Sequence, residues 1–474
     1  MELRLVGSEM CIRDRSFRVE IDSLGEVKVP KDALWGPQTQ RAVENFPISG
    51  IKFKFPFGRS FLKALGAIKF SAAEANQYLG LLPAKKASAI KHGAQLVIDG
   101  DVDEHFPIDV FQTGSGTSTN MNANEVIASI ASKKLKNKVS PNDEVNLSQS
   151  SNDTIPTAIC LSSLFDLNDI LLPNLAKLIN EINNKAKKLK GKTKTGRTHL
   201  MDAMPIDFSQ EIFAWAAQLK NCKAQIENSL SLMQQLPQGG TAIGSGVNSH
   251  KDFSKTFCES LSRKVGIKVQ PSKNFFEIMS SQDNAAHLSS SLKNLALALI
   301  KISNDLRLMN SGPLTGLSDI ELEALQPGSS IMPGKVNPVI PEAVIMAGTD
   351  VIGNDVSVSL AVQSGNFQLN VMLPLIAYNV LKSINLLGNC LPPLGKCIKN
   401  FKVNEKGISE NLHRNPILVT ALNSIIGYKK AAEIAKKAYK EKKSIIDVAE
   451  EMTNIERKEL ESLLDPKNLT KPFF

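Results

Sequence analysis

Apolar residues recur every three or four positions over long stretches of the chain, which is the spacing of one helix face. Between residues 208 and 236 they form one stripe of about eight turns, at Ile212, Trp215, Leu219, Cys222, Ile226, Leu230 and Met233. Similar stretches cover residues 157–190, 284–310, 343–362 and 374–391. Helices of this length pack most simply side by side, so we predict an all-α fold built on a long-helix bundle.

Signals for β-strands are weak. Residues 17–21 and 26–29 alternate well enough to form a small hairpin around residues 23–25. Pro156, Pro205 and Pro374 stand near the starts of the predicted helices, where a missing backbone N–H costs little.

Composition sets the scale of the molecule. A chain of 474 residues is too long for one core, so two or three domains are expected. Hydrophobic residues make up 42% and aromatic residues only 5%, which suits aliphatic helix packing. The net charge of +9 would help to gather a small dianionic substrate. A nucleic-acid partner is not expected, because the densest lysine cluster, residues 428–443, contains only two tyrosines.

Cysteine usage and targeting signals bear on the compartment. The six cysteines form no C-x-x-C pair, which favours a reducing compartment over a disulfide scaffold or a zinc site. No apolar run approaches the roughly 20 residues of a membrane span. Residues 1–15 lack the apolar segment of a signal peptide and resemble translated sequencing-adapter sequence, so we treat them as a non-native leader. We therefore expect a cytoplasmic protein.

Five loops between the helices are rich in Gly, Ser, Thr and Asn. Neutral amides and hydroxyls in place of charge suggest that these loops converge on one polar site, and they cover residues 112–125, 142–153, 196–205, 239–248 and 327–338.

The loop at residues 327–338 reads PGSSIMPGKVNP. Gly328 and Gly334 allow sharp bends, and Lys335 and Asn337 place a cation and an amide beyond the serines. A dicarboxylate needs such a cation, and a flexible loop can close over it. An ordinary surface loop is the alternative interpretation.

His199 is the one histidine of six that lies in a polar loop, beside Arg197 and Thr198. An imidazole titrates near pH 6.5, so it can serve as acid or base at neutral pH. The alternative is a hydrogen-bonded structural histidine. Glu342 follows the Lys335 loop and would orient the imidazole.

Two further segments, residues 114–122 and 148–153, stack hydroxyls and amides at predicted helix starts. For Ser118, Thr119 and Ser148 we predict N-capping, whereas the same donors would also bind carboxylates. The glycine-rich residues 239–246 lack the lysine of a phosphate loop and follow no predicted strand. Histidine and carboxylate residues show no metal-ligand spacing. We expect no cofactor and no metal.

Five motifs match in order and spacing those of the fumarase/aspartase superfamily: FQTGSGTSTNMNANE, NLSQSSNDTIPTA, GRTHLMDAMP, QGGTAIGSGVN and GSSIMPGKVNP. Within it, the chain resembles the class II fumarases from about Phe17 to Tyr439 and beyond. The resemblance implies a three-domain, all-helical subunit whose long helices form a twenty-helix core in a homotetramer, with each active site shared among three subunits. It divides the chain into the leader 1–15, an N-terminal domain 16–149, a central helical bundle 150–406 and a small C-terminal helical domain 407–474.

The resemblance also implies an activity, the reversible and metal-free hydration of fumarate to L-malate in the tricarboxylic acid cycle. Ser329 matches the base that takes the C3 proton, and His199, backed by Glu342, matches the residue that handles the proton of the water. Lys335 would stabilise the negative charge that develops on the substrate carboxylate. The other implied substrate-binding residues are Ser115, Gly116, Thr117, Ser150, Ser151, Asn152, Thr198, Ser330 and Asn337.

Two positions depart from the family pattern. An accessory dicarboxylate site with the motif H-P-N-D here begins with Ser140, so Asn142 and Asp143 are only candidates for that site. Met201 stands where other members carry Gln.

Three alternatives remain at this stage. Aspartate ammonia-lyase shares the scaffold, but Gly334 and residues 365–370 favour a fumarase. Argininosuccinate and adenylosuccinate lyases are further away, because their larger substrates need other loops. A non-catalytic, crystallin-like structural protein would have no physical reason to retain the full set of implied catalytic residues.

Overall fold

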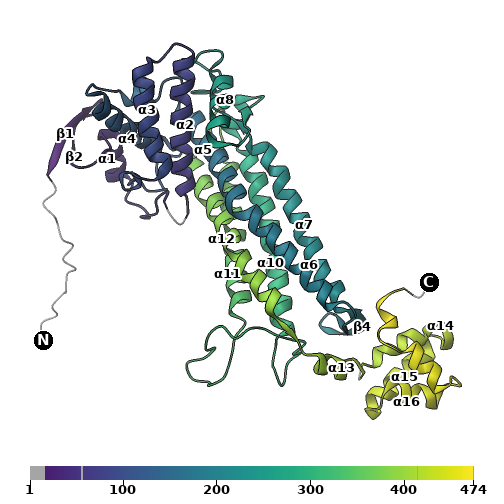
Figure 1. Ribbon diagram of the computed structural model, residues 1–474. Coiled ribbons are helices and arrows are strands. Elements are labelled where there is room, and N and C mark those ends of the chain that lie inside the picture. Colours follow the sequence, from purple (N-terminus) through teal and green to yellow (C-terminus); the bar gives the residue numbers. More distant parts are fainter. Residues whose placement is uncertain (1–15, 55–56, 414, 473–474) are drawn as a thin grey trace, which may run out of the picture. The chain divides into compact units, whose positions relative to one another are not determined.

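Long helices dominate the computed structural model, which describes residues 16–54, 57–413 and 415–472 (Figure 1). The helices are α1 (Pro37–Asn45), α2 (Arg59–Tyr78), α3 (Ala84–Asp99), α4 (Thr117–Leu135), α5 (Ser151–Asp166), α6 (Leu172–Leu189), α7 (Phe208–Met233), α8 (Phe253–Val265), α9 (Phe275–Ser280), α10 (Asp283–Met309), α11 (Val339–Val362), α12 (Leu373–Asn400), α13 (Glu405–His413), α14 (Asn423–Ile426), α15 (Tyr428–Glu441), α16 (Ile445–Met452) and α17 (Arg457–Leu463). Short helical turns are η1 (Asp103–His105), η2 (Pro141–Val145), η3 (Leu167–Leu171), η4 (Pro416–Leu422) and η5 (Asn468–Thr470). The strands form two-stranded sheets: β1 (Phe17–Asp22) with β2 (Gly25–Pro30), β3 (Thr193–Thr198) with β4 (Met201–Asp207), β5 (Gln235–Leu236) with β6 (Gln270–Pro271), and β7 (Ile320–Glu321) with β8 (Lys402–Val403).

The predicted all-α fold is confirmed, and each predicted long helix is present. Helix α12 runs past the predicted end at residue 391 and includes Pro392 and Pro393. The stretch predicted over residues 157–190 is divided by η3, a π-helical turn that joins α5 to α6. Pro173 follows this turn and lacks the N–H that a regular helix would use. The predicted β1–β2 hairpin is also confirmed, whereas the β3–β4 hairpin was not predicted. Residues 1–15, assigned to a leader, lie outside the described residues.

The chain forms two compact units, and each is described by itself. Of the described residues, unit 1 comprises those within 16–170, 226–293 and 351–385, and unit 2 those within 171–225, 294–350 and 386–472.

In unit 1, α2 packs against α3, α5 and α8 (Figure 1). Small residues let the helices approach closely. A Cβ on Gly66 would lie 2.9 Å from the carbonyl oxygen of Ala94 on α3. A Cβ on Gly93 would lie 3.1 Å from the carbonyl oxygen of Ile127 on α4. The close packing of α2, α3 and α4 fixes the helix start that carries the first group of predicted site residues.

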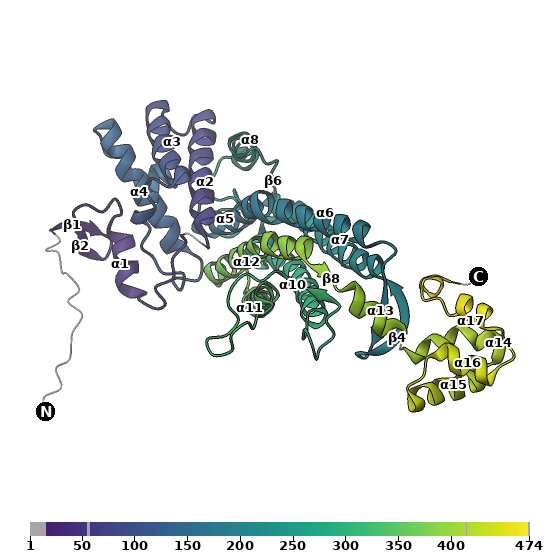
Figure 2. The ribbon, with the colours of Figure 1, turned by 60° about the horizontal axis from the view of Figure 1, so that its bottom comes forward.

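In unit 2, the buried Trp215 of α7 donates from Nε1 to Asp305 Oδ2 of α10 at 3.1 Å. The segment after α13 has a hydrophobic core of its own, and Figure 2 shows α14 to α17 gathered together. The fully buried members of this core include Leu422, Ile434, Val448, Ala449 and Leu460.

One helical stretch of the described chain, Ser151–Leu189, has the length and apolarity of a membrane span, and 78% of its most apolar window is buried within the protein. The sequence analysis predicted a helix here but no membrane span, because polar residues interrupt the apolar ones. Its burial is that of an inner helix in a packed bundle.

A carboxyl group is buried at the end of α5. Asp166 is 7% exposed, and its Oδ2 accepts hydrogen bonds from Ser60 Oγ at 2.9 Å and Asn385 Nδ2 at 2.8 Å. Burial raises the pKa of Asp166 to about 6, from an ordinary value of 3.8, against the opposing effect of these two donors. Because the folded pKa lies above the unfolded one, the folded state is favoured when Asp166 is protonated. That contribution to stability is lost as the pH rises from about 4 to about 6.

We predict that Asp166→Asn stabilises the protein more at pH 7.5 than at pH 4.5, by about 2–3 kcal/mol. The amide oxygen would still accept from Ser60 and Asn385, but the side chain would no longer ionise. The difference in Tm from wild type, measured by calorimetry at both pH values, tests this. Asp169→Asn is the control, because the Asp169 side chain is 66% exposed. Equal Tm differences at both pH values would contradict the prediction.

Candidate active site

Helix α4 begins at a turn that carries two hydroxyl groups. Its N-cap, Gly116, has a left-handed φ of +70°, a conformation that glycine adopts readily. A Cβ on Gly116 would also lie 2.9 Å from the side chain of Ile155. Ser115 Oγ and Thr117 Oγ1 share a hydrogen bond of 2.8 Å. These predicted site residues therefore lie at the positive end of a helix dipole.

Helix α5 begins with a capping box. Ser150 Oγ accepts from the backbone N–H of Asn152 at 3.2 Å, and Asp153 Oδ1 accepts from the N–H of Ser150 at 2.9 Å. Asn152 Nδ2 also donates to the carbonyl oxygen of Ala242 at 2.8 Å. This links the start of α5 to the glycine-rich segment at residues 239–246.

Asp153 holds that link from inside the protein. Its side chain is fully buried, and Oδ2 accepts from the N–H groups of Gly239 and Thr241, both at 2.9 Å. Burial raises the pKa of Asp153 to about 6, although three backbone N–H groups oppose this shift. The sequence analysis did not single out Asp153. The S-x-x-D spacing before an apolar run is a capping signature that would have identified it.

The two helix starts adjoin each other. Asn120, fully buried in the first turn of α4, donates from Nδ2 to Ser151 Oγ of α5 at 2.9 Å. The structure thus brings together six of the predicted site residues in unit 1, namely Ser115, Gly116, Thr117, Ser150, Ser151 and Asn152.

The prediction that Ser118, Thr119 and Ser148 cap helices is wrong. Ser118 and Thr119 lie inside the first turn of α4, whose cap is Gly116 without a side-chain hydrogen bond. Ser148 has a φ of +62°, and its hydroxyl donates to Asn76 Oδ1 at 2.8 Å. The capping side chain of α5 is that of Ser150, because its extended backbone conformation directs Oγ at the free N–H groups.

In unit 2, His199 lies at the tip of the β3–β4 hairpin. Thr198 pairs with Met201, so His199 and Leu200 form the two-residue turn, with φ of +55° and +60°. Such turns usually contain Asn and Gly. Holding other residues in this conformation costs about 1–2 kcal/mol each, and strain of this kind concentrates at functional sites. Thr198, His199 and Leu200 are all exposed.

A buried ion network anchors the base of this hairpin. Asp319, 2% exposed, lies 3.0 Å from Lys194 Nζ and 2.8 Å from Arg197 Nη1. Lys194, 3% exposed, also pairs with Glu211 at 3.0 Å. The hairpin that presents His199 is therefore fixed at its buried end.

The predicted flexible loop is closed on itself. The N–H of Gly328 donates to the carbonyl oxygen of Lys335 at 2.8 Å, and Asn337 Nδ2 donates to the carbonyl oxygen of Gly328 at 2.7 Å. A Cβ on Gly328 would lie 2.6 Å from the Lys335 oxygen, so this position requires glycine. Gly334 has a φ of +80° and makes the second bend.

The Ser329 hydroxyl lies within this loop, next to the exposed Ser330. Ser329 Oγ accepts hydrogen bonds from the backbone N–H groups of Met332, at 2.9 Å, and Ile331, at 3.2 Å. Backbone donors of this kind stabilise negative charge on an oxygen atom. The sequence analysis predicted the mobile serine but not which N–H groups contact it.

Lys335 is exposed and forms no ion pair within the described part of the chain, so its charge is available to an anion. Glu342 lies in the first turn of α11. No hydrogen bond joins it to His199 among residues 16–54, 57–413 and 415–472, so the single chain leaves the predicted support of the imidazole unformed.

The candidate accessory site is a turn that satisfies its own polar groups. Ser140 Oγ donates to Asp143 Oδ2 at 2.7 Å and accepts from the N–H of Asp143 at 3.1 Å. The N–H of Ser140 donates to Glu144 Oε2 at 2.8 Å. Asn142 and Asp143 are exposed. Two carboxylates at this turn oppose the binding of a dianion.

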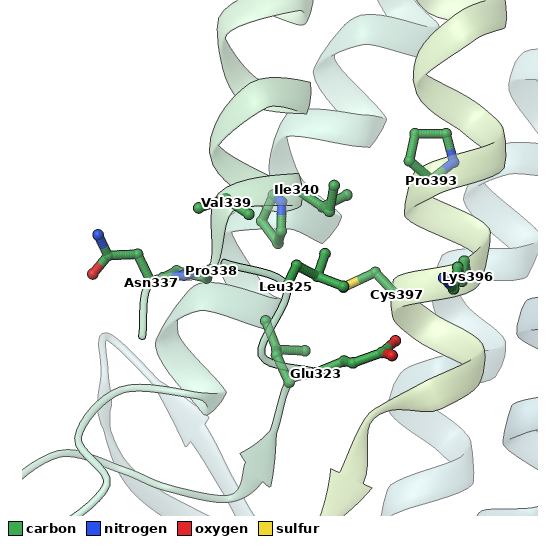
Figure 3. Close-up of a pocket in the computed structure, with 11 residues that line it drawn as sticks. Glu323, Leu325, Asn337, Pro338, Val339, Ile340, Pro393, Lys396 and Cys397 are labelled. Carbon is green, nitrogen blue, oxygen red and sulfur yellow. The ribbon is translucent and has the colours of Figure 1, made fainter. Parts of the chain in front are cut away.

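A small apolar cavity of about 210 Å³ lies between the residues that flank the Ser329 loop and helix α12 (Figure 3). Figure 3 shows the amide of Asn337 pointing away from it, consistent with the hydrogen bond to Gly328. Neither Ser329 nor Lys335 lines this cavity. Its lining residues include Leu322, Leu325, Val339, Ile340, Pro393 and Cys397.

Within the described residues, no three His, Cys, Asp or Glu side chains gather as a metal site. The five cysteines described there are free. Burial raises the pKa of the Cys160 and Cys258 thiols to about 12, so both stay protonated at neutral pH.

Two family models match the chain. The model of the lyase family covers residues 25–353, which is more than half of the chain, and the model of the fumarase C C-terminus covers residues 418–471. The helical fold and the polar loops are therefore those of a lyase.

Known proteins narrow the class. Fumarate hydratase class II 2 of Pseudomonas aeruginosa is 54% identical and aligns over 96% of this chain and 98% of its own length. Fumarate hydratase class II of Xylella fastidiosa is 53% identical and aligns over 99% of this chain and 98% of its own length. The crystal structure of class II fumarase from Schistosoma mansoni superimposes with a TM-score of 0.94 at 35% identity, covering 97% of this chain and all of the other. The chain belongs to the class II fumarate hydratase family.

We predict that Asp319→Asn destabilises the hairpin that carries His199. The substitution leaves Lys194 and Arg197 without their shared buried anion, and breaking such a pair costs about 3–5 kcal/mol. Calorimetry should show a Tm several degrees lower, and hydrogen exchange should show faster exchange of the β3–β4 amides. Asp202→Asn is the matched control, since Asp202 is 61% exposed and lies 3.9 Å from Arg197. A Tm for Asp319→Asn equal to that of the control would count against the anchor.

Proposed function

We propose that this chain catalyses the reversible addition of water to fumarate, giving L-malate, as a step of the tricarboxylic acid cycle. The observation that carries the proposal is the Ser329 loop of this family member, in which two backbone N–H groups contact the serine oxygen and an unpaired Lys335 follows. Relatives at 53% and 54% identity are fumarate hydratases of class II.

The substrate is a small dicarboxylate, which needs two anion-binding groups. One is supplied by the adjoining starts of α4 and α5, where Ser115, Thr117, Ser150, Ser151 and Asn152 offer hydroxyl, amide and backbone donors. Helix N-termini bind carboxylates through such donors and through the helix dipole. The other is supplied by unit 2, with the Lys335 cation at its centre and with Thr198, Ser330 and Asn337 as neutral donors.

The proton transfers fall to unit 2. In the direction of malate dehydration, Ser329 takes the C3 proton and negative charge builds on the adjacent carboxylate, where Lys335 and Asn337 stabilise it. The C2–O bond then breaks, and His199 returns a proton to the departing hydroxide, so that water leaves. Hydration is the reverse. The N–H groups of Ile331 and Met332 favour the alkoxide of Ser329 and so lower the cost of making it a base. Glu342 keeps the imidazole oriented.

Active sites shared among three subunits of a homotetramer complete this arrangement. Among the described residues of the single chain, no hydrogen bond joins His199 to Glu342, and we propose that this pair forms between neighbouring copies. Helix α11 supports assembly because large apolar side chains lie on its exposed side, where Met346 is 68%, Val356 54% and Leu360 56% exposed. Exposed apolar side chains grouped on one surface are typical of a protein–protein contact, here the twenty-helix core.

The remaining expectations form part of the same proposal. The hydrophobic core over residues 418–469 supports a small C-terminal domain at 407–474, beside domains at 16–149 and 150–406. Free, buried thiols support a cytoplasmic location. The self-satisfied Ser140 turn argues that Asn142 and Asp143 do not bind a second dicarboxylate.

We predict that the tetramer depends on the exposed side of α11. Sedimentation velocity should give the mass of about four chains of 51.6 kDa for wild type, and Met346→Asp should give smaller species, because it places a charge in an apolar interface. Leu24→Asp, at an exposed hairpin turn, should remain tetrameric. A monomeric wild type would refute the shared site.

We predict that the purified chain consumes fumarate in plain buffer, followed by its ultraviolet absorbance, and forms L-malate. Ser329→Ala should lower kcat by roughly 10²–10⁴-fold, the usual contribution of a positioned base. Gln326→Ala, at an exposed position just before this loop, should leave kcat unchanged.

The alternatives give different results in this assay. Fumarate loss only in the presence of ammonia would identify an aspartate ammonia-lyase. No loss in either buffer, from an assembled protein, would favour the lyases of larger substrates or a structural protein. Near-normal turnover by Ser329→Ala would remove the serine from the mechanism.

A further inference from the structure

A lysine is buried behind the starts of α4 and α5, outside the groups assigned to the reaction. Lys69 of α2 is 0% exposed, and its Nζ donates to Asn146 Oδ1 at 3.0 Å and to Gln149 Oε1 at 2.9 Å. Burial lowers the pKa of Lys69 to about 7, while Asp153 opposes this shift. Burying an amine costs free energy of solvation, which the fold accepts at this position.

The amine sets the direction of a chain of hydrogen bonds. The ammonium form of Lys69 has only N–H donors and no acceptor, so both neighbouring side chains turn oxygen atoms towards it. Asn146 Oδ1 is therefore fixed as an acceptor. Asn120 and Asn124 contact the same oxygen at 3.3 and 3.1 Å, so both must present Nδ2.

This series of hydrogen bonds ends at the hydroxyl of Ser151, a residue proposed to bind the substrate. Asn120 Nδ2, already turned towards Asn146, also contacts Ser151 Oγ at 2.9 Å. Ser151 must therefore accept from Asn120, and its single proton remains to be donated elsewhere. Within the described residues, the Ser151 hydroxyl has no acceptor.

This orientation has a visible cost. The Oδ1 atoms of Asn120 and Asn124 are buried without a hydrogen-bond partner in the described structure. An unsatisfied buried acceptor is uncommon in native proteins and calls for an explanation. Lys69 supplies it, because turning either amide would place its Oδ1 against the fixed acceptor oxygen of Asn146.

We propose that Lys69 is a positioning residue that acts through Asn146 and Asn120 to make Ser151 an obligate hydrogen-bond donor to a carboxylate of the substrate. If the Ser151 hydroxyl could rotate freely, its lone pairs would face the carboxylate for part of the time, and no hydrogen bond would then form. The inference rests on the proposed function, since it assumes that Ser151 contacts a dicarboxylate.

The test uses the full-length enzyme and fumarate hydration. Lys69→Met removes the donor and keeps the side-chain length, so KM should rise roughly tenfold to hundredfold, the loss expected for a hydrogen bond to a charged group. The change in kcat should be smaller, because the carboxylate is bound in the ground state as well. Lys63→Met, on the same helix but 41% exposed, should keep the wild-type KM.

A double-mutant cycle separates positioning from a general structural role. If Lys69 acts through Ser151, then Ser151→Ala alone should raise KM as much as Lys69→Met and Ser151→Ala together. Additive effects would overturn the inference. If Lys69→Met does not fold, Asn120→Asp takes its place in the cycle, because a carboxylate at 120 accepts the Ser151 proton and turns it from the substrate. An unchanged KM for Asn120→Asp would likewise overturn it.

The wild-type assay is read first. Absence of fumarate turnover would overturn both the proposed function and this inference. Normal turnover with an additive cycle would overturn the inference alone.

Discussion

A buried carboxylate, that of Asp153, holds the start of α5 in place, and the groups of α5 that are proposed to bind the substrate depend on it. One oxygen accepts from Ser150 within the capping box, and the other accepts from Gly239 and Thr241. Without it, buried N–H groups from two segments would lose their acceptor, at a cost of about 1–3 kcal/mol each. The opposite charge of Lys69 compensates part of its desolvation. The start of α5 is thus held in place by polar groups that are themselves buried.

The proposed site residues at the starts of α4 and α5 differ in physical character from those in unit 2. At α4 and α5, the proposed donors are neutral groups on rigid helix starts. Such groups can bind an anion and do not form ion pairs with neighbouring side chains. In unit 2, the groups proposed for proton transfer, His199 and Ser329, lie on a strained turn and a self-closed loop. Strain at the turn is offset by the buried pair of Asp319 with Lys194 and Arg197. The proposed binding groups and the proposed catalytic groups are therefore carried by separate elements of one chain.

Prediction from the sequence succeeded where a pattern is local and periodic. The long apolar stripes identify the helices because each buried face repeats with the helical period. The β3–β4 hairpin was missed, since its turn residues His199 and Leu200 lack the Asn-Gly signal on which hairpin prediction relies. The end of α12 was also missed, because Pro392 and Pro393 normally indicate termination. The N-cap of α4 is a glycine, so its hydroxyl neighbours were given the wrong role.

The sequence by itself determined the helical class, the positions of the polar loops and the residue types that a dicarboxylate site needs, because these follow from local spacing and motif. Only the tertiary structure decided which atoms meet. The hydrogen bond from Asn120 to Ser151 and the bond from Lys69 to Asn146 join residues 31 and 77 positions apart. The backbone donors to Ser329 depend on how the loop closes. Such contacts are set by helix packing and chain reversal, which no local pattern records, and they fix the direction in which each hydroxyl can donate.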